Sequence, residues 1–283
     1  MAKTTFCITL AALTTVGLTL GFTQTARAET IDCTPITSVP MVINTQGVWC
    51  LTQDLSTGST SGNAIEITTS NVTIDMNGWK LGGLAAGAGT NARGIAANNR
   101  NNITIRNGNV RGFRIGVEVL GGQGHLVEDV RAEGNTAIGI NVTGDGSIVR
   151  RNQVVDTGGS TVTNSAYGIQ IGGGGVRVLN NEVDGVEATG NGNGYGIFAL
   201  AATGAIIQDN RVTGLLSDSG ASAGITIGLA DALVEHNLVS ALNEAPDYGI
   251  YFVLGIGGYR NNYVYGATTP YSGGTSGGDN DSL

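Results

Sequence analysis

Two pairs of ionisable residues occupy equivalent places in a repeated turn of the sequence and could act as acids or bases. Asp209 and His236 fall at the same position of two consecutive repeats, with Glu235 beside them. A carboxylate near an imidazole can transfer protons in general acid–base catalysis. Asp129 and Arg151 also fall at this position in two consecutive repeats. They could act as an acid and as an anchor for an anion. A solvated turn with charge pairs is the alternative interpretation, because such pairs commonly arise where equivalent positions stack.

A second set of residues has the side chains that bind sugars, because amides hydrogen-bond to hydroxyl groups and aromatic rings stack on C–H faces. One outward position in the first strand of each repeat holds Ala96, Glu118, Asn141, Gln170, Phe198, Thr226 and Tyr251. The binding candidates among them are Glu118, Asn141, Gln170, Phe198 and Tyr251. Three tyrosines just before the repeat form either a second stacking platform or a structural stack at a corner: Tyr167, Tyr195 and Tyr248. An ordinary polar sheet face is the alternative for the whole column.

These columns arise because the chain repeats itself. A Gly-Ile-x-Ile phrase, or a close variant, recurs every 22 to 29 residues, at Gly94, Gly116, Gly139, Gly168, Gly196, Gly224 and Gly249. Each copy continues into a second apolar strand, an Asn-rich corner and a short apolar segment that usually ends at a small residue. Strands of period two in a repeat of this length predict a solenoid, in which each copy is one coil stacked on the last.

The corner after the second strand is the most regular slot. On consecutive coils it holds Asn152, Asn181, Asn210, Asn237 and Asn262. We expect these amides to form one buried or half-buried ladder, with Asn selected because it tolerates a left-handed backbone. Two residues further on comes an apolar slot, which begins with Trp79 and Val110.

One outward column of the second strand is too apolar for an exposed face. It contains Leu126, Ile148, Ile206 and Leu233, divided by Arg177. Such patches are seldom left bare, so we expect cover from insert loops, from the C-terminal tail or from a second copy of the chain. Cover within one chain is preferred, which makes the protein a monomer, with a homo-oligomer through these four residues as the alternative.

The N-terminal sequence predicts export. Lys3, an apolar stretch and the Ala26-Arg27-Ala28 motif predict a signal peptide over residues 1–28 and hence a secreted or periplasmic protein. No later segment is long and apolar enough to span a membrane. In an oxidising compartment Cys33 and Cys50 are expected to form a disulfide. The formal net charge of −8 argues against nucleic acid as a partner.

The remaining chain divides into an N-terminal cap with an opening coil (29–63), a parallel β-helix (64–266) and a Gly/Ser-rich tail (267–283), which we expect to be flexible. Longer segments rich in Gly, Ser, Asn and Asp are expected as loops on one corner. They are Thr157–Ala166, Glu187–Gly194, Leu216–Ser222 and Leu242–Asp247. Such inserts often form the wall of a binding surface in a solenoid.

From Ala64 to Gly266 the repeats resemble those of exported bacterial right-handed parallel β-helix proteins with PbH1-type repeats, in the superfamily of the pectate lyases. The resemblance implies an all-β, single-domain solenoid of about eight or nine coils. The superfamily includes polysaccharide lyases, epimerases, hydrolases, phage tailspikes and non-catalytic surface proteins, so the fold does not choose a function.

The catalytic signatures of that superfamily are missing, including Asp-Pro-His-Glu and runs of aspartates followed by Arg or Lys. We therefore expect a non-catalytic glycan-binding or surface-structural protein with no cofactor and a polysaccharide as the partner. The alternative is a lyase, epimerase or glycoside hydrolase that acts on an acidic glycan; if it were a lyase, it could need Ca²⁺.

Overall fold

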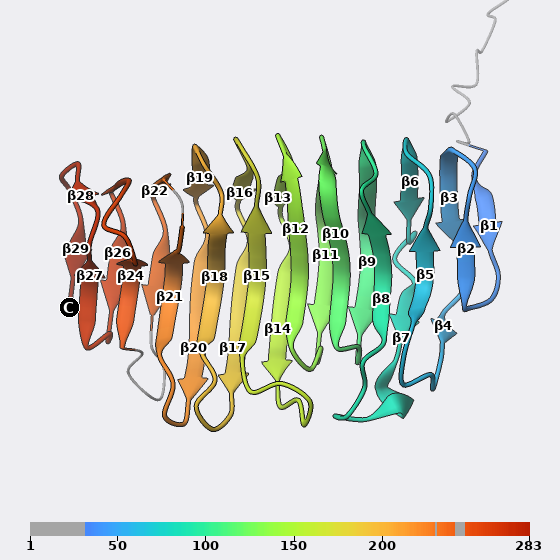
Figure 1. Cartoon of the computed structure of the whole chain (residues 1–283), viewed down its shortest axis with the longest axis horizontal. Coiled ribbons are helices and arrows are strands. Elements are labelled where there is room, and N and C mark those ends of the chain that lie inside the picture. The colour runs from blue at the N-terminus through green and yellow to red at the C-terminus, as the bar shows by residue number, and fades with distance from the viewer. Residues whose placement is uncertain (1–31, 230, 241–246) are drawn as a thin grey trace, which may run out of the picture. The chain divides into compact units, whose positions relative to one another are not determined.

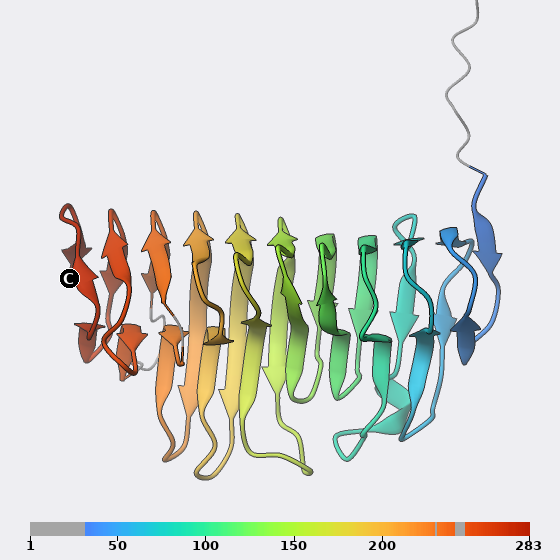
Figure 2. The same cartoon turned by 45° about the horizontal axis from the view of Figure 1, so that its top comes forward.

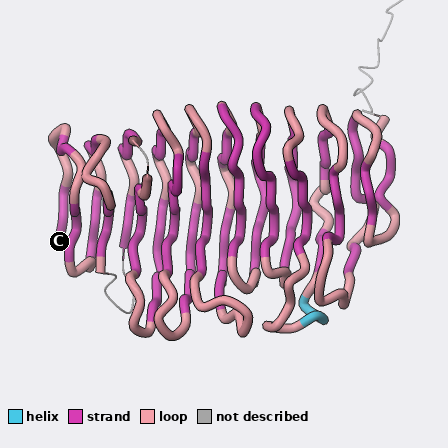
Figure 3. Tube along the Cα trace, in the orientation of Figure 1, coloured by secondary structure: helices cyan, strands magenta, loops and turns pink. Residues whose placement is uncertain are grey.

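The computed structural model describes residues 32–229, 231–240 and 247–283. Residues Asp32–Leu283 form one compact unit, whereas the predicted signal peptide (1–28) lies outside the described residues. The unit is the all-β, right-handed parallel β-helix that the sequence predicts (Figure 1). The described residues include a single short 3-10 helix, η1 (Leu84–Ala86), and otherwise strands and loops (Figure 3). Within these ranges no helix is long and apolar enough to cross a membrane.

The strands stack in three parallel ladders. The first ladder is a ten-stranded sheet to which each coil contributes one strand. Its strands are β2 (Met41–Ile43), β5 (Asn63–Ile67), β8 (Arg93–Asn98), β10 (Ile115–Gln123), β12 (Ile138–Asp145), β15 (Ala166–Gly172), β18 (Gly194–Ala201), β21 (Ser222–Ile227), β24 (Tyr248–Phe252) and β27 (Thr269–Ser272).

The second and third ladders belong to one continuous sheet, because β9 and β11 are long enough to take part in both. The second ladder contains β1 (Thr34–Ile36), β3 (Gly47–Leu51), β6 (Val72–Asp75), β9 (Ile103–Arg111), β11 (Leu126–Glu133), β13 (Ile148–Arg150), β16 (Arg177–Leu179), β19 (Ala205–Gln208), β22 (Ala232–Glu235), β25 (Gly258–Arg260) and β28 (Thr275–Ser276). The third contains β4 (Leu55–Ser56), β7 (Lys80–Gly82), the ends of β9 and β11, β14 (Gln153–Gly158), β17 (Glu182–Ala188), β20 (Arg211–Ser217), β23 (Leu238–Ser240), β26 (Tyr263–Tyr265) and β29 (Asp281–Ser282).

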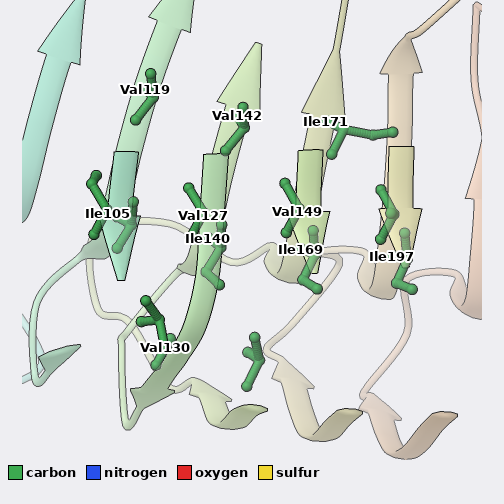
Figure 4. Close-up of a cluster of buried hydrophobic side chains, with 14 of the residues drawn as sticks. Ile105, Val119, Val127, Val130, Ile140, Val142, Val149, Ile169, Ile171 and Ile197 are labelled. Carbon is green, nitrogen blue, oxygen red and sulfur yellow. The ribbon is translucent and has the colours of Figure 1, made fainter. Parts of the chain in front are cut away.

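Each ladder sends at least one aliphatic column into a narrow core. In the coil that starts at β15, Ile169, Val178 and Val183 come from the three ladders in turn, and all three are fully buried. Their equivalents on the neighbouring coils are buried as well (Figure 4). Branched aliphatic side chains suit this position because they pack closely on a pleated surface. The core is therefore a stack of nearly identical layers, which explains the repeat in the sequence.

The predicted asparagines form a continuous ladder at the corner between the second and third ladders. Each is at most 2 % exposed. The amide Nδ2 of Asn181 donates to Oδ1 of Asn210 at 2.9 Å, and Asn210 donates in the same way to Asn237 at 3.0 Å. The chain of bonds starts at the backbone N–H of Val130, which donates to Asn152, and continues through Asn262.

The left-handed backbone is not where the sequence interpretation placed it. It occurs one residue before the asparagine ladder, where φ is 52° to 60° at Asn107, Asp129, Arg151, Asn180, Asp209, His236 and Asn261. The ladder asparagines have no positive φ. They are therefore favoured by their amide hydrogen bonds, and left-handed tolerance explains the residue before them.

The alignment of Trp79 with Val110 in the apolar column is also wrong. Leu81 pairs in register with Val110 and is fully buried, whereas Trp79 is 41 % exposed. This coil has a longer corner, because Asn77 and Gly78 both adopt positive φ before the strand resumes. The two extra residues shift the register and turn the indole outward.

The prediction of a flexible tail over 267–283 is wrong as well. These residues form β27, β28 and β29, which pair with β24, β25 and β26 as a further coil. Tyr271 stacks on Tyr259 with ring centroids 5.0 Å apart, and its hydroxyl donates to the carbonyl oxygens of Asn262 and Asp281. Asn280 accepts a hydrogen bond from Asn262 and so extends the ladder by one member. The segment therefore closes the C-terminal end of the core.

At the N-terminal end a disulfide joins Cys33 to Cys50, with Cα atoms 5.7 Å apart. Cys50 lies on β3, where it is buried, and β1 pairs alongside in parallel. The bond thus fixes the opening strand to the first complete coil.

The longer loops lie where they were expected, on the corner between the third ladder and the first, along one edge of the stack (Figures 1 and 2). They stack on one another: Asn164 Nδ2 donates to Asn191 Oδ1 at 3.0 Å, and Ser219 N–H donates to the carbonyl of Gly190. The loop predicted at Leu242–Asp247 lies outside the described residues except for Asp247.

Candidate functional site

The outer face of the first ladder collects the predicted binding column. The registers place Glu66, Ala96, Glu118, Asn141, Gln170, Phe198, Thr226 and Tyr251 side by side on consecutive strands. Each step is one strand spacing, about 4.8 Å. The sequence interpretation began this column at Ala96 and missed Glu66, although the Ile65-x-Ile67 pattern that carries it was a signal.

The C-terminal half of this face is aromatic. Tyr167, Tyr195 and Phe198 form a mutually packed group with ring centroids 5.2 to 5.7 Å apart. Tyr248 and Tyr251 form a stacked pair at 4.3 Å. We call these five residues the aromatic cluster. The three tyrosines occupy the outward column next to that of Phe198 and Tyr251, so one surface joins two columns that the sequence interpretation treated separately.

The aromatic cluster is partly sunk into the face. Tyr195 is buried, and this burial raises the pKa of its hydroxyl above the usual value. The other four rings are half-buried and keep accessible area. Between the two groups, β21 contributes only Ala223 and Thr226 to the outward columns. Half-buried rings fixed by their neighbours present a rigid apolar surface to a ligand.

Amides and a carboxylate occupy the middle of the face. Asn141 is 7 % exposed, and its Oδ1 has no hydrogen-bond partner within the described structure. The flanking Gln170 is half-buried. Glu118 is 7 % exposed and forms an ion pair with Nε of Arg93. An unpaired buried acceptor costs stability, and this one lies between Glu118 and Gln170 in the outward column.

A hollow of about 230 Å³ lies in the N-terminal half of the face. Its lining includes Glu66, Arg93, Arg100 and Glu118 around the small side chain of Ala96. Sequence reasoning identified Glu118 here but neither arginine, because single arginines on different strands give no local pattern.

The predicted acid–base residues lie elsewhere, at the corner between the second and third ladders. Arg151 donates from Nε and Nη2 to the two oxygens of Asp129 at 2.9 and 2.8 Å, and from Nη2 to Glu128 at 2.7 Å. Hydrogen bonding from Arg151 lowers the pKa of the Asp129 carboxyl and raises the pKa of the guanidinium. Asp129 is thus held ionised in a salt bridge, which does not suit a proton donor at neutral pH.

The second predicted pair is not assembled either. His236 Nε2 lies 3.1 Å from Nδ2 of Asn261, and Asp209 accepts from Gln208 at 2.8 Å. Glu235 accepts from Arg260 Nε at 2.7 Å. No hydrogen bond joins Asp209 to His236 in the part of the chain that the structure describes. The described residues also contain no group of three or more His, Cys, Asp or Glu side chains arranged to hold a metal ion.

The outward apolar column of the second ladder is intermediate in exposure. Leu126, Ile148, Ile206 and Leu233 stand in one register with Arg177 between them. The four apolar residues are half-buried, whereas Arg177 is exposed. Cover within one chain is therefore incomplete for this column, and contact with a second copy stays the alternative.

Comparison with known proteins identifies no relative by sequence: no protein-family model and no curated protein matches the chain. Among solved structures, the chain is similar to the A-module of mannuronan C-5 epimerase AlgE6 from Azotobacter vinelandii, at 12 % identity and a TM-score of 0.49, over 88 % of this chain and 89 % of that one. A likeness of this degree says nothing about ligand or activity. By the parallel registers and repeated coils described above, the chain is a right-handed parallel β-helix protein.

Proposed function

We propose that this protein is an exported glycan-binding protein that holds a polysaccharide along the outer face of its first ladder. The observation that supports this most strongly is the aromatic cluster, which continues across the face into Gln170, Asn141 and the charged hollow. Sugars present C–H faces that stack on rings and hydroxyl groups that bond to amides and carboxylates, so a face of this composition suits them.

The arrangement suits a polymer better than a small molecule. The column from Ala96 to Tyr251 crosses seven strands, so six spacings of about 4.8 Å extend over roughly 29 Å. Side chains of different chemistry follow one another along this line. An extended chain of sugar units can contact several of them at once.

Binding without catalysis is the function that the charges favour. Asp129, Glu235 and Glu118 are each neutralised by an arginine, and Asp209 and His236 do not contact each other through a hydrogen bond. A lyase, an epimerase or a hydrolase that acts on an acidic glycan remains the second candidate, because two carboxylates border the hollow.

An oxidising location fits the same proposal. The Cys33–Cys50 disulfide is of the kind that persists outside the cytosol, and the N-terminal sequence has the features of a secretory signal. A secreted or periplasmic protein would meet polysaccharides of a cell surface or of the surroundings.

The test is binding of the exported protein to a panel of immobilised and soluble polysaccharides, with Phe198→Ala and Tyr251→Ala as variants. Each should weaken binding roughly 2- to 10-fold, the size of one aromatic contact. Tyr265→Ala is the matched control, since Tyr265 is exposed on the third ladder. Unchanged affinity in both face variants contradicts the proposal. Release of reducing ends or of unsaturated, ultraviolet-absorbing products would favour the enzyme instead.

A further inference from the structure

The hollow in the first ladder exists because of one small residue. Glu66, Ala96 and Glu118 are consecutive in register on β5, β8 and β10. Ala96 has the smallest side chain among the eight aligned residues from Glu66 to Tyr251. It leaves a gap of about 230 Å³ between two glutamates, which is comparable to the volume of one sugar unit.

Charged groups of both signs border this gap. Arg93 lies on β8 and pairs with Glu118, and Arg100 follows in the next turn. No ion pair engages Arg100 or Glu66 among the described residues, although they line the same hollow. The Nε of Arg100 and the Oδ1 of Asn63 are buried and have no hydrogen-bond partner there. The hollow is thus bordered by a carboxylate and a guanidinium that no ion pair within the described residues neutralises.

The formal charges in the hollow cancel, because two glutamates face two arginines. A charged ligand attracted by the two arginines would be repelled by the two glutamates, or the reverse. It would also lose its hydration on entering the hollow. Hydroxyl groups meet no such conflict, since each can donate to a carboxylate and accept from a guanidinium. Adjacent hydroxyls also match the two oxygens of a carboxylate.

We propose that the hollow around Ala96 is a subsite for one uncharged sugar unit, held through its hydroxyl groups by Glu66, Arg93, Arg100 and Glu118. This assignment rests on the proposed glycan-binding function and adds the substrate class: the bound polysaccharide is neutral where it enters this site. Ala96 and Phe198 are four strand spacings apart, about 19 Å. The ligand is therefore an oligosaccharide that reaches from the hollow to the aromatic cluster.

The experiment compares matched hexasaccharides that differ only in charge: β-glucan with glucuronan, galactan with galacturonan, and mannan with mannuronan. Dissociation constants are measured by calorimetry at low and high salt. The neutral member of at least one pair should bind ten times more tightly than its uronate partner, with little dependence on salt, because no net charge is neutralised. Tighter binding of a uronate, weakened by salt, overturns the inference.

Three variants locate the site. Ala96→Leu fills the hollow and should weaken binding of the neutral hexasaccharide at least tenfold, and Glu66→Gln and Arg100→Gln should each weaken it several-fold. Glu182→Gln, in an exposed ion pair on the third ladder, is the matched control. Thermal unfolding shows whether each variant is folded. If Ala96→Leu does not fold, the binding of Glu66→Gln and Arg100→Gln tests the site.

The outcomes separate the two proposals. If the wild type binds and Phe198→Ala weakens binding, but none of the hollow variants does, the glycan-binding function holds and this subsite is wrong. If no hexasaccharide or polysaccharide binds the wild type, both proposals are wrong. Loss of binding in the hollow variants with the expected preference for the neutral sugar supports both.

Discussion

Asn210, at the corner between the second and third ladders, and Asn141, on the outer face of the first ladder, are both more than nine-tenths buried. The amide of Asn210 donates to Asn237 Oδ1 and to the carbonyl of Val178, and its Oδ1 accepts from Asn181. The Oδ1 of Asn141 has no partner in the described structure. The same side chain is thus hydrogen-bonded to its neighbours at the corner and carries an unpaired oxygen on the face.

The surroundings of the two asparagines also differ: the corner is regular from coil to coil, whereas the face varies along the stack. At the corner, β16 and β17 are joined by only two residues, so successive coils superimpose and their amides meet. The opposite corner carries loops of different length, and the adjacent face changes from charged to aromatic along the stack. Regular columns stabilise a solenoid, whereas function is to be sought where a column varies.

The largest effect is expected for Asn210→Leu. Loss of the amide leaves Asn181 Nδ2 and the backbone N–H of Asn181 without their buried acceptor, so the free energy of unfolding should fall by about 1–3 kcal/mol. Urea unfolding measures this change. Gln208→Leu, two residues earlier at the end of β19 where the side chain is only half-buried, should cost much less. Equal losses in the two variants would mean that the ladder contributes little cohesion.

The free energy of unfolding should depend on pH through His125, a buried polar group at the corner between the first and second ladders. Its Nδ1 accepts from Ile103 N–H and its Nε2 lies 2.9 Å from the carbonyl of Gly121, which requires the neutral ring. Burial lowers the pKa of His125. The unfolded chain therefore takes up its proton at higher pH than the folded one, so stability is full above about pH 6.5 and falls as the pH drops below it.

Urea unfolding between pH 5 and 7.5 tests this sign. His125→Gln should flatten the pH dependence in that range, since the side chain no longer titrates. A slope that survives in His125→Gln would assign the effect to other groups.

A smaller effect is expected at Arg151, whose backbone is left-handed with φ of 52°. Asparagine adopts this conformation more readily than arginine, so Arg151→Asn relieves backbone strain while it removes an exposed ion pair with Asp129. Glu128 keeps its contact with Arg150. The thermal midpoint should stay constant or rise slightly. A clear drop would show that the salt-bridge cluster supports the corner more than its exposure suggests.

The features of the fold that could be predicted from the sequence are those that repeat from coil to coil. The strands, their register and the asparagine ladder follow from residues such as Ile169, Val178 and Asn181, because identical environments on each coil select similar side chains. Errors occurred where periodicity breaks. Trp79 follows a longer corner, and the C-terminal coil has short strands rich in Gly, Ser and Thr. The stacking of Tyr271 that closes the core is a contact between coils, which composition does not reveal.

The candidate site was predictable only in part, for a related reason. The outward column of Phe198 and Tyr251 follows from the register, and so does its neighbour with Tyr167. The hollow depends on which side chain is small and on the arginines, Arg93 and Arg100, that line it from outside the column. These are three-dimensional properties of single residues on different strands, and no repeated pattern marks them.

The smallest effect on stability is expected for Asn141→Leu, which also tests most sharply the contrast between Asn141 and Asn210. Leucine has a similar volume and removes an acceptor that has no partner, so unfolding free energy should change by less than about 0.5 kcal/mol or rise. Binding of the glycan should nevertheless weaken, because the amide lies between Glu118 and Gln170 on the proposed path. Urea unfolding and calorimetric titration measure the two quantities on the same preparation. A loss of stability as large as that of Asn210→Leu would mean that Asn141 is structural, and that the distinction between a hydrogen-bonded corner and an unpaired amide on the face does not hold at this position.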